Sequence, residues 1–334
     1  MLGSSLSSSQ RAIEKHSLSP SVRAYSSPEG LRKDEDVDFL VIGVKAPLHR
    51  QALMPNLLNG NLKALFVEWP IDRTLDGTEE IARITKEQGI RTVVGMQGRY
   101  TAVSRRLAEI VNGGNGKIGK VLSTTVTGTV GSGDGSVEKK GVKFSLDPNS
   151  GATILCQTFA LQSEVKSVSG LVKTMHATTS IADDATGEIL EKEVPKRSPD
   201  QVLAQGTLKR TGQQPADDDI AWSLHMRGGT SLGGGLRWLI YGKRGEIEVT
   251  GPIGMIPQIH LPAPWRIRVK AGSAEEVEEE VVAEAEPGQP AVSRLWDAFL
   301  RGESSWPDFE HAVKIHRFVD AVRRSSAEGK VVKL

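Results

Sequence analysis

Three short apolar runs near the start of the chain constrain its fold most strongly. They begin at Asp38, Ala64 and Thr92 and read DFLVIGV, ALFVE and TVVGM. Near-continuous apolar runs of this length are typical of parallel strands that are buried on both faces. Helical patterns fill the intervals between them. Strand, helix, strand, helix, strand at this spacing predicts part of a doubly wound sheet with right-handed crossovers.

The turns that follow the three runs are the expected ligand site, because open sheets of this kind bind ligands outside the carboxyl ends of their strands. The interval 76–90 predicts a helix with a capping box from Asp76 to Glu79 and a terminal Gly89. A second helix is predicted over 103–111, where apolar residues recur with the helical period.

The second half of the chain predicts an α+β domain with a large, mostly antiparallel sheet, because β-rich segments alternate with glycine and polar turns. We expect a Rossmann-like domain over 1–117, an α+β substrate and dimerisation domain over 118–300, and a closing helix and tail over 301–334. We predict that Ser305 caps that helix together with Asp308 and that the acidic run 274–286 is a solvated strand or loop. The β-rich segments are Val121–Val130, Glu164–Met175, Gln201–Leu208, Ile220–Arg227, Leu236–Gly242 and Gly245–Gly251.

Composition excludes several classes of protein. The 42 basic and 41 acidic residues give a net charge of +1, so no large single-sign field favours nucleic acid or an anionic membrane. The single cysteine, Cys156, excludes an internal disulfide framework and a multi-cysteine metal site, and we expect a buried, inert thiol. No run approaches the roughly 18 apolar residues of a membrane span, and the first residues lack signal-peptide features. We expect a cytoplasmic protein, which can also be nuclear.

The segment 37–70 resembles the Gfo/Idh/MocA family of nicotinamide-dependent oxidoreductases. It combines a strand, a turn with Val44, Pro47 and His49, a helix, a second strand and an element similar to that family's Glu-Lys-Pro. Segments 98–126 and 308–330 look like the family's join into its second domain and its final helix. FVEWP and MQGR are similar to the fungal branch of the family, which includes the yeast galactose-pathway repressor.

This resemblance implies a dinucleotide site at the strand ends. Ser4 and Ser5 would stand where the ribose of the adenosine half is bound, and small hydroxyls leave room for a 2′-phosphate, so NADP is expected, with NAD as the alternative. The serines can instead simply cap the first helix, and His49 can simply cap the helix that follows it. The residues implied for cofactor binding are Ser4, Ser5, Val44, Lys45, Pro47, His49, Glu68, Trp69, Pro70, Gln97 and Arg99.

Three departures from the family stand out. Trp69 replaces the family's catalytic lysine, and an indole N–H cannot shuttle a proton near neutrality. The first strand and its Gly-x-Gly-x-x-Gly turn are missing, which predicts a partial Rossmann sheet. Segment 151–162 lacks the expected aspartate and histidine, and its helix looks shortened. A sheet without its first strand would expose apolar edges, so we expect reduced stability or a partner that covers the gap.

Two functions follow from the resemblance. One is an oxidoreductase-like protein that uses NADP(H) for hydride transfer on a carbonyl or alcohol of a small molecule. The alternative is a non-catalytic, dinucleotide-sensing regulator, and a poorly folding remnant is a third reading. We expect a small-molecule substrate or a regulatory protein as partner, a homodimer through the second-domain sheet, and no direct contact with nucleic acid. No metal site is expected, because His311 and His316 are spaced unsuitably for one ion.

Overall fold

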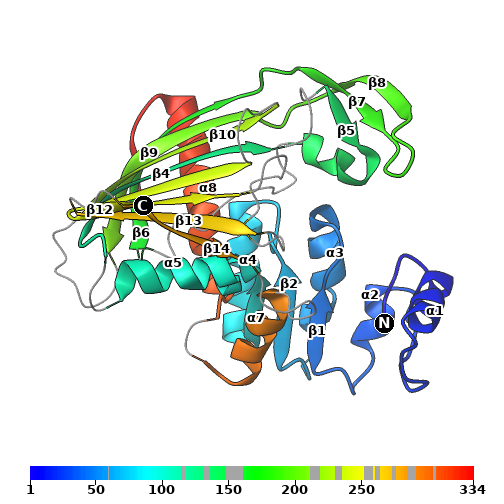
Figure 1. Cartoon of the computed structure of the whole chain (residues 1–334). Coiled ribbons are helices and arrows are strands. Elements are labelled where there is room, and N and C mark those ends of the chain that lie inside the picture. Colours follow the sequence, from blue (N-terminus) through cyan, green and yellow to red (C-terminus); the bar gives the residue numbers. More distant parts are fainter. Residues whose placement is uncertain are drawn as a thin grey trace. The chain divides into compact units, whose positions relative to one another are not determined.

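The computed structural model of the chain is shown in Figure 1. It divides into two compact units, Met1–Met96 with Trp306–Lys314, and Gln97–Ser305 with Ile315–Leu334. The structure describes residues 1–58, 60–113, 117–130, 136–147, 161, 163–210, 219–229, 235–251, 259, 264–272, 276–283, 291–303 and 306–334.

The first unit contains a parallel sheet in the order β1 (Phe39–Ile42), β2 (Ala64–Glu68) and β3 (Arg91–Gly95). Ile42 lies beside Val67, and Glu68 lies beside Gly95. The three strands therefore end at one edge of the sheet. The predicted parallel sheet and the convergence of its strand ends are confirmed.

The central strand β2 is buried on both faces, since the successive residues Leu65, Phe66 and Val67 are each at most 3% exposed, and the first unit also contains several helices. They are α1 (Leu6–Lys15), α2 (Pro28–Arg32), η1 (Ala46–Leu48), α3 (His49–Leu53), η2 (Asn56–Leu58), α4 (Leu75–Glu87) and the first turns of α8 (Phe309–Glu328). The closing helix α8 starts after Asp308, whose carboxylate accepts a hydrogen bond from the His311 amide at 2.8 Å. The buried core includes Leu40, Ile42, Leu53, Leu57, Leu65, Val67, Ile81, Val94, Phe309 and Ala312.

The start of α4 differs from the prediction. Thr74 is the N-cap, and its hydroxyl accepts a hydrogen bond from the Gly77 amide at 3.1 Å. Asp76 lies inside the first turn, so the predicted capping box from Asp76 to Glu79 is wrong: the threonine two residues earlier already satisfies the free amide. Gly89 follows the helix with φ of 67°, which confirms its predicted role at the C-terminus.

The second unit is dominated by a nine-stranded sheet in the order β14-β13-β12-β11-β4-β10-β9-β6-β15. All neighbours pair antiparallel except β10 and β4, which are parallel. The predicted large, mostly antiparallel sheet is confirmed. The strands are β4 (Val121–Val130), β6 (Ser163–Lys173), β9 (Gln201–Arg210), β10 (Ile220–Gly228), β11 (Leu236–Gly242), β12 (Gly245–Thr250), β13 (Trp265–Ala271), β14 (Glu278–Val282) and β15 (Val332–Lys333).

One face of the large sheet packs on α5 (Ala102–Asn112) and on the later turns of α8, and Trp222 and Trp238 are buried there. Trp222 meets Phe318 of α8 edge to face, with ring centroids 5.5 Å apart. Residues that alternate with this core are exposed on the other face, among them Leu171, Leu203 and Tyr241. The unit also contains η3 (Gln97–Tyr100), α7 (Ala291–Leu300), η4 (Lys140–Leu146) and a small sheet of β5 (Val137–Lys139), β7 (Thr178–Ala182) and β8 (Ile189–Pro195).

The acidic run 274–286 includes the exposed strand β14. This agrees with the first of the two predicted alternatives, a solvated strand. Glu278 pairs with Lys117, Glu279 pairs with Arg266, and Glu280 accepts from Arg106 at 2.9 Å. Cys156, Ser305 and all of segment 151–162 except Leu161 lie outside the described residues.

Candidate functional site

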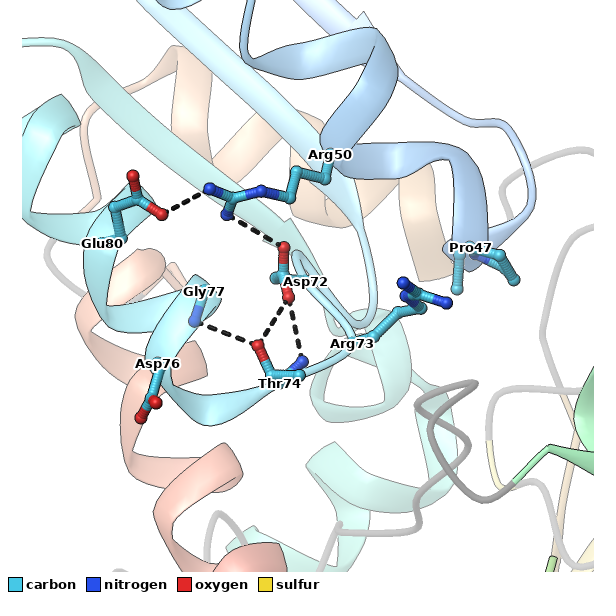
Figure 2. A pocket seen from close by; sticks show the side chains of 9 residues that line it. Pro47, Arg50, Asp72, Arg73, Thr74, Asp76, Gly77 and Glu80 are labelled. Atoms are coloured by element: carbon cyan, nitrogen blue, oxygen red, sulfur yellow. Dashed lines mark hydrogen bonds and ion pairs between the residues drawn. The ribbon is translucent and has the colours of Figure 1, made fainter. Parts of the chain in front are cut away.

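A cavity of about 340 Å³ opens in the first unit, beyond the carboxyl ends of β1 and β2 (Figure 2). The turn after β1 and the start of α3 form one wall. The loop after β2 and the first turns of α4 form the other. The cavity therefore lies where a ligand crevice is expected for a parallel sheet. Its lining residues are Ala46, Pro47, Arg50, Asp72, Arg73, Thr74, Asp76, Gly77 and Glu80.

A network of charged side chains links the two walls. The buried Asp72 carboxylate accepts hydrogen bonds from the Thr74 amide at 2.9 Å and the Thr74 hydroxyl at 3.0 Å. Its other oxygen accepts from the Arg50 guanidinium at 3.3 Å, and Arg50 also donates to Glu80. The hydrogen bond to Glu80, assisted by Asp72, raises the pKa of Arg50. The charge of Arg50 is thus already compensated inside the protein.

Arg73 is the other arginine that lines the cavity, and it takes no part in this network. Its side chain is exposed, lines the cavity and extends toward Pro47, away from Glu80 (Figure 2). Within the described part of the chain, Arg73 makes no hydrogen bond or ion pair. It therefore remains available to an anionic group in the cavity.

His49 ties together the two turns that carry the cavity walls. Its ring is 1% exposed, with Nδ1 2.7 Å from the Pro70 carbonyl and Nε2 2.8 Å from the Val44 carbonyl. A ring with a proton on each nitrogen donates to both carbonyls, whereas a neutral ring donates to one. The helix-cap alternative for His49 is wrong, because its side chain bonds two carbonyls and makes no cap hydrogen bond to α3.

Strand β2 ends at Glu68, and Trp69 and Pro70 follow it. The Glu68 carboxyl leans over Gly95 of β3 so closely that a Cβ on Gly95 would overlap it. Burial raises the pKa of Glu68, although a hydrogen bond from the Trp69 amide acts in the opposite direction. Trp69 is partly buried and packs against the core of the first unit.

The remaining predicted residues lie elsewhere. Ser5 caps α1, accepting from the Ser8 amide at 3.1 Å, which confirms the capping alternative for this residue, and Ser4 bonds the Ser8 hydroxyl at 3.3 Å. Lys45 precedes η1 and is exposed. Gln97 and Arg99 lie in η3, which belongs to the second unit.

Sequence reasoning located the strand ends but missed most of the side chains that line the cavity. Arg50, Asp72, Arg73 and Glu80 come together only because α3, the loop after β2 and α4 meet in space. The one local signal is the pair Asp72 and Thr74, two residues of the kind that cap helices, directly after a predicted strand.

The described residues contain no cluster of three or more His, Cys, Asp or Glu side chains suited to a metal ion. Within the same residues, no helix is long and apolar enough to cross a membrane.

Comparison with known proteins gives two family matches. Residues 3–96 match the oxidoreductase family with the NAD-binding Rossmann fold, and residues 103–251 match the Gal80p C-terminal domain. Dehydrogenase aclE of Aspergillus oryzae is 27% identical over 98% of this chain and 86% of its own length. The galactose/lactose metabolism regulatory protein GAL80 of Saccharomyces cerevisiae is 28% identical over 69% of this chain, a match that spans only 54% of GAL80.

Solved structures share the fold. A super-repressor mutant of Gal80p from Saccharomyces cerevisiae superposes with a TM-score of 0.81, at 21% identity over 99% of this chain and 88% of that chain. Levoglucosan dehydrogenase, in complex with NADH and levoglucosan, gives a TM-score of 0.73 at 15% identity, over 100% of this chain and 88% of the other.

Proposed function

Since the chain joins a Gfo/Idh/MocA-type Rossmann domain to a Gal80p-like C-terminal domain, we propose that it binds a nicotinamide dinucleotide at the ends of β1 and β2. NADP(H) is the expected form, with NAD(H) as the alternative. The cavity between the turn after β1 and the start of α4 carries this proposal. Open parallel sheets bind nucleotides at this position.

The residues present suit part of a dinucleotide. Arg73 offers an uncompensated guanidinium to a phosphate, the exposed Asp76 offers a carboxylate to ribose hydroxyls, and Pro47 offers an apolar surface. The volume is at the low end of the range of about 300–1,000 Å³ for small-molecule pockets. The cavity therefore accommodates a portion of the dinucleotide, and the rest extends over the strand ends.

Hydride transfer to or from a small carbonyl or alcohol is the chemistry that a bound nicotinamide supplies. This chain contributes binding and orientation: Arg73 holds an anionic group, and His49 fixes the two turns against each other. Glu68 supplies a partly buried carboxyl at the end of β2. The likeness to dehydrogenase aclE over nearly the whole chain supports this function.

A second function, that of a dinucleotide-sensing regulator, is favoured by Trp69. The residue stands where the family has a lysine and packs against the core, and its indole N–H cannot transfer a proton near neutrality. The likeness to GAL80 supports this alternative and makes a regulatory protein a candidate partner. We also propose that a second copy docks on the exposed face of the nine-stranded sheet, which includes Leu171, Leu203 and Tyr241.

Fluorescence titration of the full chain with NADPH tests the proposal. Saturable quenching of tryptophan emission is expected, and Trp69→Phe should remove most of the change, because Trp69 directly follows β2 and precedes the loop that lines the cavity. Absence of quenching up to millimolar NADPH would exclude dinucleotide binding. Consumption of NADPH with a panel of small aldehydes and ketones would favour the oxidoreductase, and saturable binding without turnover would favour the regulator.

A further inference from the structure

Both ring nitrogens of His49 face carbonyl oxygens, one from each of the two turns beside the cavity. Nδ1 lies 2.7 Å from the Pro70 carbonyl oxygen, and Nε2 lies 2.8 Å from the Val44 carbonyl oxygen. A carbonyl oxygen only accepts hydrogen bonds, so each nitrogen needs a proton to bond at these distances. A neutral ring carries one proton, and its other nitrogen would direct a lone pair at an oxygen. The observed arrangement therefore suits the doubly protonated, positively charged ring.

The two hydrogen bonds differ in their access to water. The bond to Pro70 is buried, whereas the bond to Val44 is only partly buried, and Val44 itself is 43% exposed. The Val44 carbonyl can accept a hydrogen bond from water instead. The Pro70 carbonyl would be left unpaired in the interior, which is costly. A ring that loses one proton should therefore keep the proton on Nδ1 and give up the bond from Nε2 to Val44.

The bond to Val44 fastens one wall of the cavity. The turn after β1 runs from Val44 into η1, and its residues Ala46 and Pro47 line the cavity. Inside this turn the Leu48 amide donates to the Lys45 carbonyl at 2.8 Å. That hydrogen bond is local, whereas the histidine ring connects the turn to the segment after β2. Loss of the ring contact should therefore loosen the turn and leave the opposite wall in place.

We propose that His49 is a pH-sensitive lock on the cavity. The doubly protonated ring holds the turn after β1 to the segment after β2. When Nε2 gives its proton to water, the Val44 carbonyl is released and the wall formed by Ala46 and Pro47 loosens. The lock lies within the first unit and does not depend on which ligand the cavity binds.

Other ionisable side chains lie on the segments that pack against α3. Between pH 5.5 and pH 8, histidine is the side chain whose charge ordinarily changes. Burial raises the pKa of Glu68 toward this range, so an experiment must separate Glu68 from His49. Strands and turns β1 and η2 carry no ionisable side chain. The ionisable residues are Arg50 on α3, Glu29 and Arg32 on α2, Lys45 before η1, and Glu68, Asp72 and Arg73 at and after the end of β2.

Nitrogen-15 NMR of the imidazole rings in the full chain, without ligand, tests the protonation of His49. The signals of His49 are those that disappear in His49→Gln. We expect protons on both nitrogens at pH 5.5 and on Nδ1 alone at pH 8. A ring with the same protonation at both pH values, or one that keeps its proton on Nε2, would overturn the proposal.

Amide hydrogen exchange tests whether the proton holds the turn. Protection of the Leu48 amide, relative to an unstructured peptide at the same pH, should be about tenfold lower at pH 8 than at pH 5.5. Loss of one hydrogen bond to a charged group changes a local opening equilibrium by about this factor. The amide of the buried Ile81, in the middle of α4, should show no such change. Equal protection of Leu48 at both pH values would overturn the proposal.

Matched variants assign the effect to one residue. His49→Gln presents one donor end and one acceptor end, like a neutral ring, and should give low protection of Leu48 at both pH values. Glu68→Gln should retain the pH dependence, and so should His16→Gln, which changes an exposed histidine at the end of α1. Loss of the dependence in either of these two variants would overturn the proposal. Should His49→Gln fail to fold, the exchange of Leu48 in the wild type, Glu68→Gln and His16→Gln still decides it.

Discussion

The carboxylate of Asp72 occupies the space that a side chain at Gly77 would need. The two residues bring the loop after β2 and the first turn of α4 into direct contact. Asp72 is held in place by Thr74 and Arg50, so it cannot move aside without breaking those hydrogen bonds. The wall of the cavity therefore depends on a glycine inside a helix, where glycine is otherwise unfavourable.

Gly77→Ala should lower the free energy of unfolding by about 1–3 kcal/mol, because the added methyl group overlaps the Asp72 carboxylate. Urea denaturation measures the effect. The matched control is Gly30→Ala in α2, where a Cβ makes only an ordinary contact with the Ser27 hydroxyl. That change should be neutral or slightly stabilising. Equal effects of the two substitutions would contradict the packing described for Asp72.

Glu68→Gln should make stability less dependent on pH. Burial raises the pKa of Glu68, so the folded state holds a proton that the unfolded state has released. Stability of the wild type should therefore fall as pH rises above the ordinary glutamate pKa of about 4.3, until Glu68 ionises in the folded state. Denaturation at pH 4.5 and pH 8 measures the free energy of unfolding of both proteins. The value for the variant should increase relative to that of the wild type at the higher pH. If the difference in unfolding free energy between the variant and the wild type is the same at both pH values, the raised pKa of Glu68 is contradicted.

The pKa of Asp200 is shifted in the opposite direction to that of Glu68. Its side chain is 1% exposed and accepts hydrogen bonds from the Met175 and His176 amides, both at 2.8 Å, and from the His176 ring at 3.0 Å. Burial alone would raise the pKa of Asp200, but these hydrogen bonds hold it below its usual value. Asp200 therefore stabilises the fold above the ordinary aspartate pKa of about 3.9, and this contribution disappears as pH falls through the lower folded pKa.

Asp200→Asn should cost about 1–3 kcal/mol of unfolding free energy at pH 7, because an amide cannot accept from three donors as the carboxylate does. The difference from the wild type should shrink near pH 3. Chemical denaturation at both pH values measures it. Asp36→Asn, which removes an exposed ion pair with Arg23, is the control and should change little. A pH-independent cost for Asp200→Asn would argue against a role for its charge.

The sequence predicted the regular elements well where burial imposes a pattern. The limits of β4 and β11 match their predicted segments, since Val126 and Trp238 alternate with exposed residues on a half-buried sheet. The short strands β5, β7 and β8 were not predicted. Seven residues of β8, Ile189–Pro195, are largely exposed, and exposed strands lack the apolar alternation that sequence patterns detect.

The site was less predictable than the fold. The strand ends at Val44, Glu68 and Met96 could be placed because parallel strands share an edge. The pairing of Arg50 with Asp72 and Glu80 depends on tertiary contacts between α3 and α4 and has no signal in local sequence. That pairing decides which arginine of the cavity is available to a ligand.

Calorimetric titration of the full chain with NADPH tests the central claim most directly, with Arg73→Ala and the exposed control Arg32→Ala measured in parallel. We expect saturable binding at one site per chain, weakened about 10- to 100-fold in Arg73→Ala by loss of a charged hydrogen bond and unchanged in Arg32→Ala. No heat at millimolar NADPH, or equal affinity in both variants, would contradict a dinucleotide site at the ends of β1 and β2.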